Sequence, residues 1–178
     1  MHAAYSVNAK RLHWLIALLI VAQFLVTLLM PDIKEGMSME PVITLHFTLG
    51  LLVLLLMAVR LVVRLRNPVE AATTPGKPLE RVLAVGVHRL FYAILLTSPF
   101  LGWIAASAHG LPVALFGIVE LPALAADHAE WGHQAGDVHG LVMWTLLGLI
   151  ALHAGAALFH HLVRRDDTLR RMLPDRSR

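Results

Sequence analysis

The chain has 178 residues, of which 57% are hydrophobic and only 15% are charged, and its mean hydropathy is +0.67. An ordinary soluble domain is about 45–50% apolar and about 25% charged, so the composition indicates a chain surrounded by lipid. The absence of cysteine excludes disulfides, thiolate-held iron–sulfur clusters, covalently attached c-type haem and a catalytic cysteine. The net charge of +3 comes from basic residues that flank apolar runs rather than form one patch, so nucleic-acid binding is not expected.

Four apolar runs are long enough to cross a bilayer, which takes about 20 residues in a helix. They cover about residues 12–30, 42–63, 83–107 and 139–163. Pro31 ends the first run, and no small-residue cleavage site follows it, so this run is expected to be a span rather than a removed signal peptide. The third run contains Pro99 and Gly102, which membrane helices tolerate. The predicted fold class is all-α: residues 1–178 form a single membrane domain, an integral four-helix bundle.

The charges of the connecting segments predict the orientation. Most of the basic residues precede the first span, lie between or at the ends of the second and third, or follow the fourth: Lys10, Arg11, Arg60, Arg64, Arg66, Lys77, Arg81, Arg164, Arg165, Arg170, Arg171, Arg176 and Arg178. The loop after the first span holds Lys34 together with Asp32, Glu35 and Glu40. The outer loop, residues 108–138, has four acidic residues and no Lys or Arg. By the positive-inside rule, both termini face the cytoplasm.

Two connecting segments have further features. The outer loop is expected to contain a short helix at about residues 127–137, and residues 67–78 are expected to form a loop. The histidines of the outer loop are expected to be solvated, with a zinc site as the weaker alternative; they are His109, His128 and His133.

The fourth span contains two histidines, His139 and His153, that are 14 residues apart. At about 3.6 residues per turn and about 1.5 Å per residue, they share one helix face and lie roughly 21 Å apart along the axis. An ionisable side chain inside the bilayer is costly and marks a functional site, and imidazole is a common axial ligand of haem iron. The spacing therefore predicts two haems, one in each leaflet.

Each of these histidines needs a partner at the same depth on another helix. The first span runs outward with His13 near its inner end, and the second runs back with His46 near its outer end. Depth therefore predicts that His13 and His153 bind the iron of an inner haem, and that His46 and His139 bind the iron of an outer haem. Two imidazoles fill both axial positions, so such a haem changes its oxidation state without binding a substrate at iron.

Several other polar residues are candidate neighbours of a haem or a quinone. His160 lies seven residues after His153, on much the same helix face, so spacing alone leaves open which of the two faces the first span. His88, near the inner end of the third span, is expected to be an interface or quinone-site residue. Arg60 and Arg64 could pair with haem propionates, although the positive-inside rule also accounts for them.

A series of short segments along nearly the whole chain has the pattern of a known family. They are Arg11-Leu12-His13-Trp14, His46 with Gly50, Arg60 with Arg64, His88, Pro99 with Gly102, His139, Leu152-His153-Ala154-Gly155-Ala156-Ala157, His160-His161, Asp167-Thr168-Leu169 and Met172-Leu173-Pro174. In these segments the chain resembles the bacterial cytochrome b561 family, which is related to the cytochrome b subunits of nickel–iron hydrogenases and formate dehydrogenases.

The resemblance implies a multi-pass protein of the bacterial inner membrane with two haem b groups, and it favours His153 over His160 as the inner ligand. The likeness is greatest to members that are superoxide oxidases, which pass electrons from superoxide at the outer face to ubiquinone. The expected function is therefore a di-haem oxidoreductase of this type, with ubiquinone as acceptor. A basic entrance would attract an anion such as superoxide, and the outer loop here has no Lys or Arg.

Two other functions are compatible with the sequence. The first is an electron-transfer cytochrome b subunit of a membrane dehydrogenase or hydrogenase, which would depend on a redox partner protein. The second is a non-haem transporter or metal-binding membrane protein, which would have no haem spectrum. The outer half-reaction needs no nucleophile or acid–base pair, and no catalytic residue or proton donor for quinone reduction is predicted.

Overall fold

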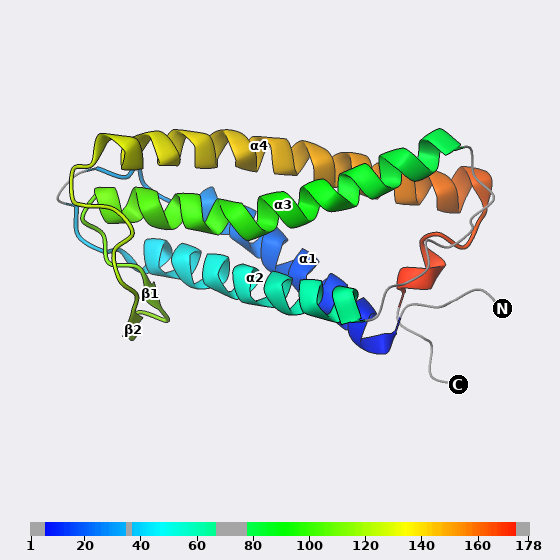
Figure 1. Cartoon of the computed structure of the whole chain (residues 1–178), viewed down its shortest axis with the longest axis horizontal. Coiled ribbons are helices and arrows are strands. Elements are labelled where there is room, and N and C mark those ends of the chain that lie inside the picture. Colours follow the sequence, from blue (N-terminus) through cyan, green and yellow to red (C-terminus); the bar gives the residue numbers. More distant parts are fainter. Residues whose placement is uncertain (1–5, 35–36, 67–77, 174–178) are drawn as a thin grey trace.

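The computed structural model describes residues 6–34, 37–66 and 78–173. Its four long helices are α1 (Val7–Thr27), α2 (Pro41–Arg66), α3 (Pro78–Ala108) and α4 (Glu130–Phe159). They run side by side along the long axis of the molecule (Figure 1), and each is long and apolar enough to cross a membrane. The predicted all-α membrane bundle is confirmed. The predicted loop at residues 67–78 lies outside the described residues, except for Pro78, which begins α3.

The bundle buries one apolar layer and leaves much of its flank apolar. The central cluster contains Ile16, Ile20, Val53, Met57, Leu95 and Leu146. Leu18 on α1 and Leu141 on α4 are 65% and 68% exposed. Such outward-facing side chains need an apolar surrounding medium, which the bilayer supplies.

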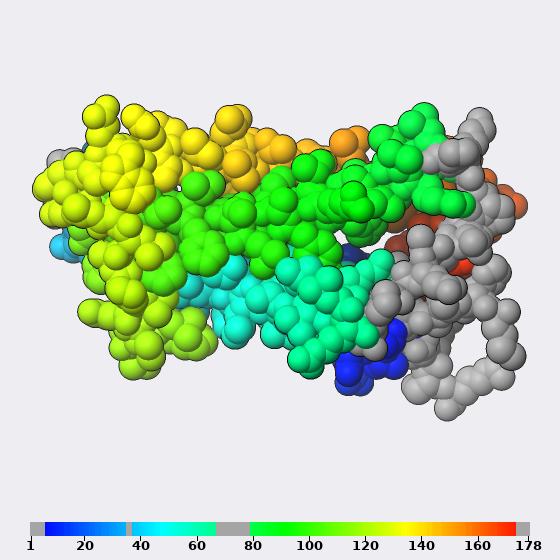
Figure 2. Space-filling model, viewed as in Figure 1, coloured from blue at the N-terminus to red at the C-terminus, as the bar shows by residue number. Residues whose placement is uncertain are grey.

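The helices do not pack equally closely. The closest pairings are α3 with α4, α1 with α2, and α2 with α3. Figure 2 shows one face of the bundle, on which α2 and α3 part toward the end where α1 begins. The looser packing of α4 against α1 and α2 leaves interior space for a bulky group.

The first helix ends at Thr27, three residues before the predicted end of the first span. Proline disfavours helical backbone in the residue before it, and Pro31 follows shortly after. The start of α1 is capped by Ser6, whose Oγ accepts a hydrogen bond from Ala9 N at 3.2 Å. Helices α2 and α3 extend beyond the predicted spans at both ends. Helix α4 begins nine residues before the predicted start and ends at Phe159, where a π-helical turn continues the span to Arg164.

The predicted separate helix at residues 127–137 is wrong, because residues from Glu130 onward are the first turns of α4. Small residues explain why α4 continues unbroken along α3. A Cβ at Gly132 would lie 2.4 Å from Ala108 Cβ, and one at Gly136 would lie 3.3 Å from Ala105 Cβ. The absence of side chains at these two positions lets the helices approach closely.

The outer segment also contains a β-hairpin that was not predicted. Strands β1 (Ala114–Leu115) and β2 (Val119–Glu120) pair antiparallel, with Leu115 opposite Val119. The turn has positive φ at Phe116 (54°) and Gly117 (67°). Glycine adopts such angles without strain, whereas most other residues are strained there.

The chain after α4 folds back toward α1. A π-helical turn, η1 (His160–Arg164), follows α4, and Arg165 is left-handed with φ 56°. The short 3₁₀ turn η2 (Arg170–Met172) then lies near α1, where Trp14 Nε1 donates to Met172 O at 2.7 Å. The start of α1 and the end of the described chain therefore lie at the same end of the bundle, as a four-span chain requires.

Candidate haem-binding site

Four histidines from three helices form two pairs inside the bundle. His13 on α1 faces His153 on α4, with ring centroids 6.3 Å apart and planes at 71°. His46 on α2 faces His139 on α4, with centroids 6.4 Å apart and planes at 82°. We call His13 and His153 the inner pair, and His46 and His139 the outer pair. The structure thus brings together the histidines that depth matched in the sequence.

The separation within each pair suits one iron between two imidazoles. A histidine nitrogen binds a first-row metal at about 2.0–2.1 Å, and it lies about 1.1 Å from the centre of its own ring. Two such ligands on opposite sides of one metal therefore place their ring centroids about 6.3 Å apart. The centroid distances of 6.3 Å and 6.4 Å match this value, so both pairs fit bis-histidine haem iron.

A cavity of about 790 Å³ surrounds the outer pair, with walls from all four helices. Its volume lies within the range of about 300–1,000 Å³ that small-molecule and cofactor pockets occupy. Gly50 and Gly140 are part of the wall beside the two histidines. No atom beyond its own helix lies within 4 Å of a Cβ added at Gly140, so there is space beside His139 for a flat macrocycle.

Helix α3 positions His139. Its Nδ1 donates to the Ser98 carbonyl at 2.9 Å, which leaves Nε2 with the lone pair that binds a metal. A Cβ at Gly102 would lie 3.3 Å from His139 Cε1, so only glycine leaves this ring its full space. The sequence pointed to Gly102 as a helix breaker and family residue but did not predict its contact with His139.

Gln23 is a residue of the outer site that the sequence analysis missed. Its Nε2 lies 3.0 Å from His46 Nδ1 and donates to His46 O at 3.0 Å. Its amide oxygen Oε1 is buried and has no hydrogen-bond partner within the described part of the chain. The signal was present, since a single polar amide in the middle of an apolar span marks a functional position.

The inner pair has a different surrounding. His88 and Phe91 on α3 both contact the His153 ring edge-on, each with centroids 5.4 Å apart. His88 Nδ1 lies 2.6 Å from the Ala84 carbonyl, which accepts a hydrogen bond from it. Arg60 Nη1 donates to Ala9 O at 3.2 Å, and Arg64 is exposed. Of the predicted neighbours, His88 contacts this pair directly, and Arg60 interacts electrostatically with both of its histidines.

His160 does not face His13, whose ring contacts that of His153 instead. The Nδ1 of His160 donates to Asp166 Oδ2 at 2.6 Å. Partial burial alone would raise the pKa of Asp166, but hydrogen bonds from His160 and Thr168 outweigh it and hold that pKa at about 2. The spacing in the sequence did not decide whether His153 or His160 pairs with His13 on α1. In the fold, only His153 faces His13.

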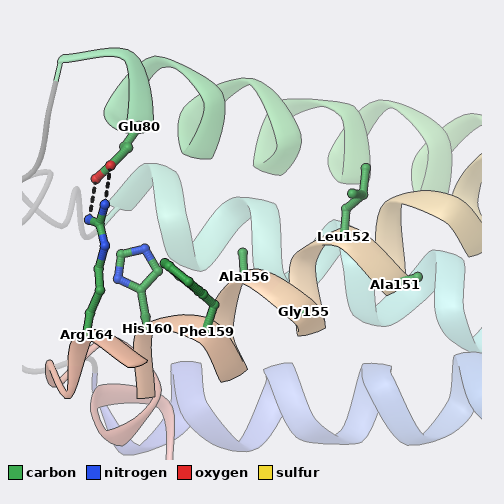
Figure 3. A pocket seen from close by; sticks show the side chains of 8 residues that line it. All are labelled: Glu80, Ala151, Leu152, Gly155, Ala156, Phe159, His160 and Arg164. Atoms are coloured by element: carbon green, nitrogen blue, oxygen red, sulfur yellow. Dashed lines mark hydrogen bonds and ion pairs between the residues drawn. The ribbon is translucent and has the colours of Figure 1, made fainter. Parts of the chain in front are cut away.

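His160 lines a second pocket, of about 570 Å³, at the end of α4 (Figure 3). Gly155 and Ala156 form its small-residue wall, and Phe159 lies beside the His160 ring. One end is closed by a bidentate ion pair, in which Arg164 donates to both Glu80 oxygens at 2.6 and 2.7 Å. The pocket is therefore apolar along α4 and polar at its inner end.

The outer-segment histidines had been predicted to be solvated, and this prediction is wrong for two of them. His109 and His133 are partly buried, with 3.2 Å between His109 Nε2 and His133 Nδ1. His109 Nδ1 also lies 2.8 Å from Ala105 O. No group of three or more metal-binding side chains occurs in residues 6–34, 37–66 and 78–173, so the zinc alternative has no support.

A bundle of four membrane helices with histidines paired at two levels fits a membrane cytochrome of the b type. The chain belongs to the family described as prokaryotic cytochrome b561, whose family model matches residues 4–175. Membership confirms the resemblance. The protein is therefore a haem b-binding, electron-transfer protein with several spans in a bacterial inner membrane.

Curated relatives match nearly the whole chain. Cytochrome b561 homolog 2 of Escherichia coli (strain K12) is 29% identical over 95% of this chain and 90% of its own length. A probable superoxide oxidase, CybB, of Yersinia pestis is 29% identical over 98% of both chains. Cytochrome b562 of Cereibacter sphaeroides is 30% identical over 93% of this chain and 92% of its own length. A non-haem transporter, the second alternative from the sequence, does not fit this family.

Proposed function

We propose that the chain binds two haem b groups, one between His13 and His153 and one between His46 and His139, and passes electrons between them across the membrane. The observation that carries this proposal is the pair of ring separations, 6.3 Å and 6.4 Å, at two levels of one bundle. Haem supplies one-electron redox chemistry when bound. The two histidines of each pair would hold one haem iron between them, so donor and acceptor would react at the haem edge and not at iron.

We further propose superoxide as the donor at the outer face and ubiquinone as the acceptor. Two superoxide ions would each give up one electron and leave as dioxygen, and one quinone would take two electrons and two protons to become the quinol. The probable superoxide oxidase of Yersinia pestis, 29% identical along its whole length, supports this donor.

The pocket of Figure 3 is the place proposed for the quinone. It begins at Ala151, beside His153 in sequence, and ends at His160 and Arg164. An apolar wall suits a quinone ring and tail, whereas its reduction also needs a proton donor in hydrogen-bond reach. His160 is the group proposed for that role, with Asp166 accepting the hydrogen bond from Nδ1 at 2.6 Å and fixing the ring.

The proposal is tested on the purified chain in quinone-containing vesicles. A reduced-minus-oxidised spectrum should give sharp low-spin bands for two haems, and superoxide should reduce ubiquinone at a rate that disproportionation alone does not explain. His160→Gln should keep both haem signals and lose quinone reduction, whereas His161→Gln serves as the matched control. A colourless protein would overturn the haem proposal. Full activity in His160→Gln would overturn the proton role alone.

A second function, an electron-transfer subunit of a larger dehydrogenase or hydrogenase, is favoured by one observation. The outer loop contains Glu120, Asp127, Glu130 and Asp137 and no Lys or Arg, so its field repels an anion and attracts a cationic partner. In that case the purified chain would carry both haems and yet be inert toward superoxide. It would be reduced instead by a partner protein with a basic surface.

A further inference from the structure

The β1–β2 hairpin presents an apolar turn to the surroundings. Phe116, Ile118 and Val119 are 63%, 82% and 55% exposed. The turn contains no charged residue, and Glu120 at its base is the first one. Clustered exposed apolar side chains mark a surface that meets lipid or another protein, so the position of the hairpin relative to the spans decides between them.

The hairpin lies against the flank of a membrane-spanning helix. Phe116 N donates to Thr48 Oγ1 at 3.0 Å, and a Cβ at Gly117 would lie 3.4 Å from Thr44 Cγ2. Both threonines belong to α2, and His46 of the outer pair lies between them. Figure 1 shows the hairpin extending beside α2, outside the four helices. The turn therefore lies at the level of the outer histidine pair rather than above the bundle.

The backbone of the hairpin is suited to an apolar medium. A polar backbone group in lipid must find its partner inside the protein. Ile118 N donates to Leu115 O at 3.1 Å, and Leu121 N donates to Val113 O at 2.9 Å. The Thr48 hydroxyl, on a side chain that is 4% exposed, accepts from Phe116 N. These three donors, which a water-exposed turn could leave to solvent, are all satisfied internally.

We infer that the β1–β2 hairpin is a lipid anchor, with the side chains of residues 116–119 inserted into the outer headgroup–acyl boundary beside α2. Its partner is the acyl region of the outer leaflet, because the exposed turn continues the lipid-facing surface of the bundle and carries no charge. Interfacial elements of this kind bury an apolar surface by about 5–10 Å in that boundary. The inference does not depend on the haems or on the electron donor.

The absence of cysteine from the sequence allows a clean test by site-directed spin labelling. Ile118→Cys is labelled in the full chain in phosphatidylcholine–phosphatidylglycerol vesicles, and its collision rates with dioxygen and with a water-soluble nickel complex are compared. Leu141→Cys, on the exposed flank of α4, is the lipid control. Gln134→Cys, exposed on the outer turns of α4, is the aqueous control.

The label at Ile118→Cys should favour dioxygen over nickel as strongly as the label at Leu141→Cys does. A nickel accessibility equal to that at Gln134→Cys would overturn the inference. Low accessibility to both agents, with dipolar broadening between labels, would also overturn it, because a second copy of the chain would then cover the turn. Val119→Cys provides a second label position, and an unchanged haem spectrum shows that each variant is folded.

Discussion

The outer and inner histidine pairs have the same internal geometry but different surroundings. The outer pair lies in a cavity and is held by polar groups, the Ser98 carbonyl on His139 and the Gln23 amide on His46. The inner pair is bordered by aromatic rings, with His88 and Phe91 against His153. Hydrogen bonds to an axial ligand and the charge around it are the levers by which a protein tunes haem potential. The two proposed haems should therefore differ in potential although their proposed ligands are identical.

The ends of the bundle also differ in charge. Acidic residues surround the outer end, whereas Arg60, Arg64 and Arg81 lie toward the inner end. A positive surrounding stabilises the reduced state of a group, and a negative one disfavours it. The charge difference alone therefore favours electron movement from the outer haem to the inner haem, the direction that the proposed function needs.

The largest expected effect comes from removing one ligand at each level. His46→Ala should abolish the outer haem and keep the inner one, so that about half of the haem absorbance remains. His153→Ala should remove the inner haem and keep the outer one. The loss of haem in each variant is measured by the haem content per chain and by the shape of the reduced-minus-oxidised spectrum. If either variant lost all haem while still folded, or lost none, the division into two independent sites would be wrong.

A smaller change tests how α3 holds the outer pair. Gly102→Ala places a methyl group 3.3 Å from His139 Cε1, and overpacking of this kind costs about 1–3 kcal/mol. We expect a lower affinity for the outer haem, seen as its selective loss during extraction or heating. The matched control is Gly148→Ala, whose added Cβ meets nothing within 4 Å. In the control, the better helix propensity of alanine should leave haem retention unchanged or slightly improve it.

The next prediction concerns Gln23. Binding of iron by His46 Nε2 would leave the proton on Nδ1. Rotation of the Gln23 amide would then turn the buried Oε1, which lacks a partner, toward that Nδ1 in place of Nε2. Gln23→Leu removes this acceptor. A hydrogen bond worth about 1 kcal/mol corresponds to about 40 mV for one electron, so the outer potential should rise by roughly that amount. The inner haem, measured in the same redox titration, is the control. An equal shift of both potentials would contradict a local role.

Much of this site could be predicted from the sequence. The two histidine pairs follow from helix periodicity and depth, because a 14-residue separation on one straight helix leaves little freedom. Gln23, Ser98 and Gly102 could not be placed, since their contacts depend on how the helices are rotated against one another. The hairpin was missed because its strands have two residues each, too few for a period-two pattern. The unbroken start of α4 depends on the contact of Gly132 with Ala108, which local sequence does not reveal.

The smallest expected effect concerns the charge of the outer end and the identity of the donor. If superoxide reacts at the outer end, the acidic residues there should repel it and slow the reaction. Salt screens these charges over about 8–10 Å at about 0.1–0.15 M, so the initial rate of superoxide oxidation should rise with ionic strength. At low salt, Asp137→Asn should raise the rate about twofold, since unit charges roughly 10 Å apart in water interact by about 0.4 kcal/mol. Asp167→Asn, at the opposite end of α4, should not change it. A superoxide-driven rate that falls with salt would contradict a repulsive field at this end. Reduction by a basic partner protein that is slowed by salt would instead support a protein donor that docks on this acidic face.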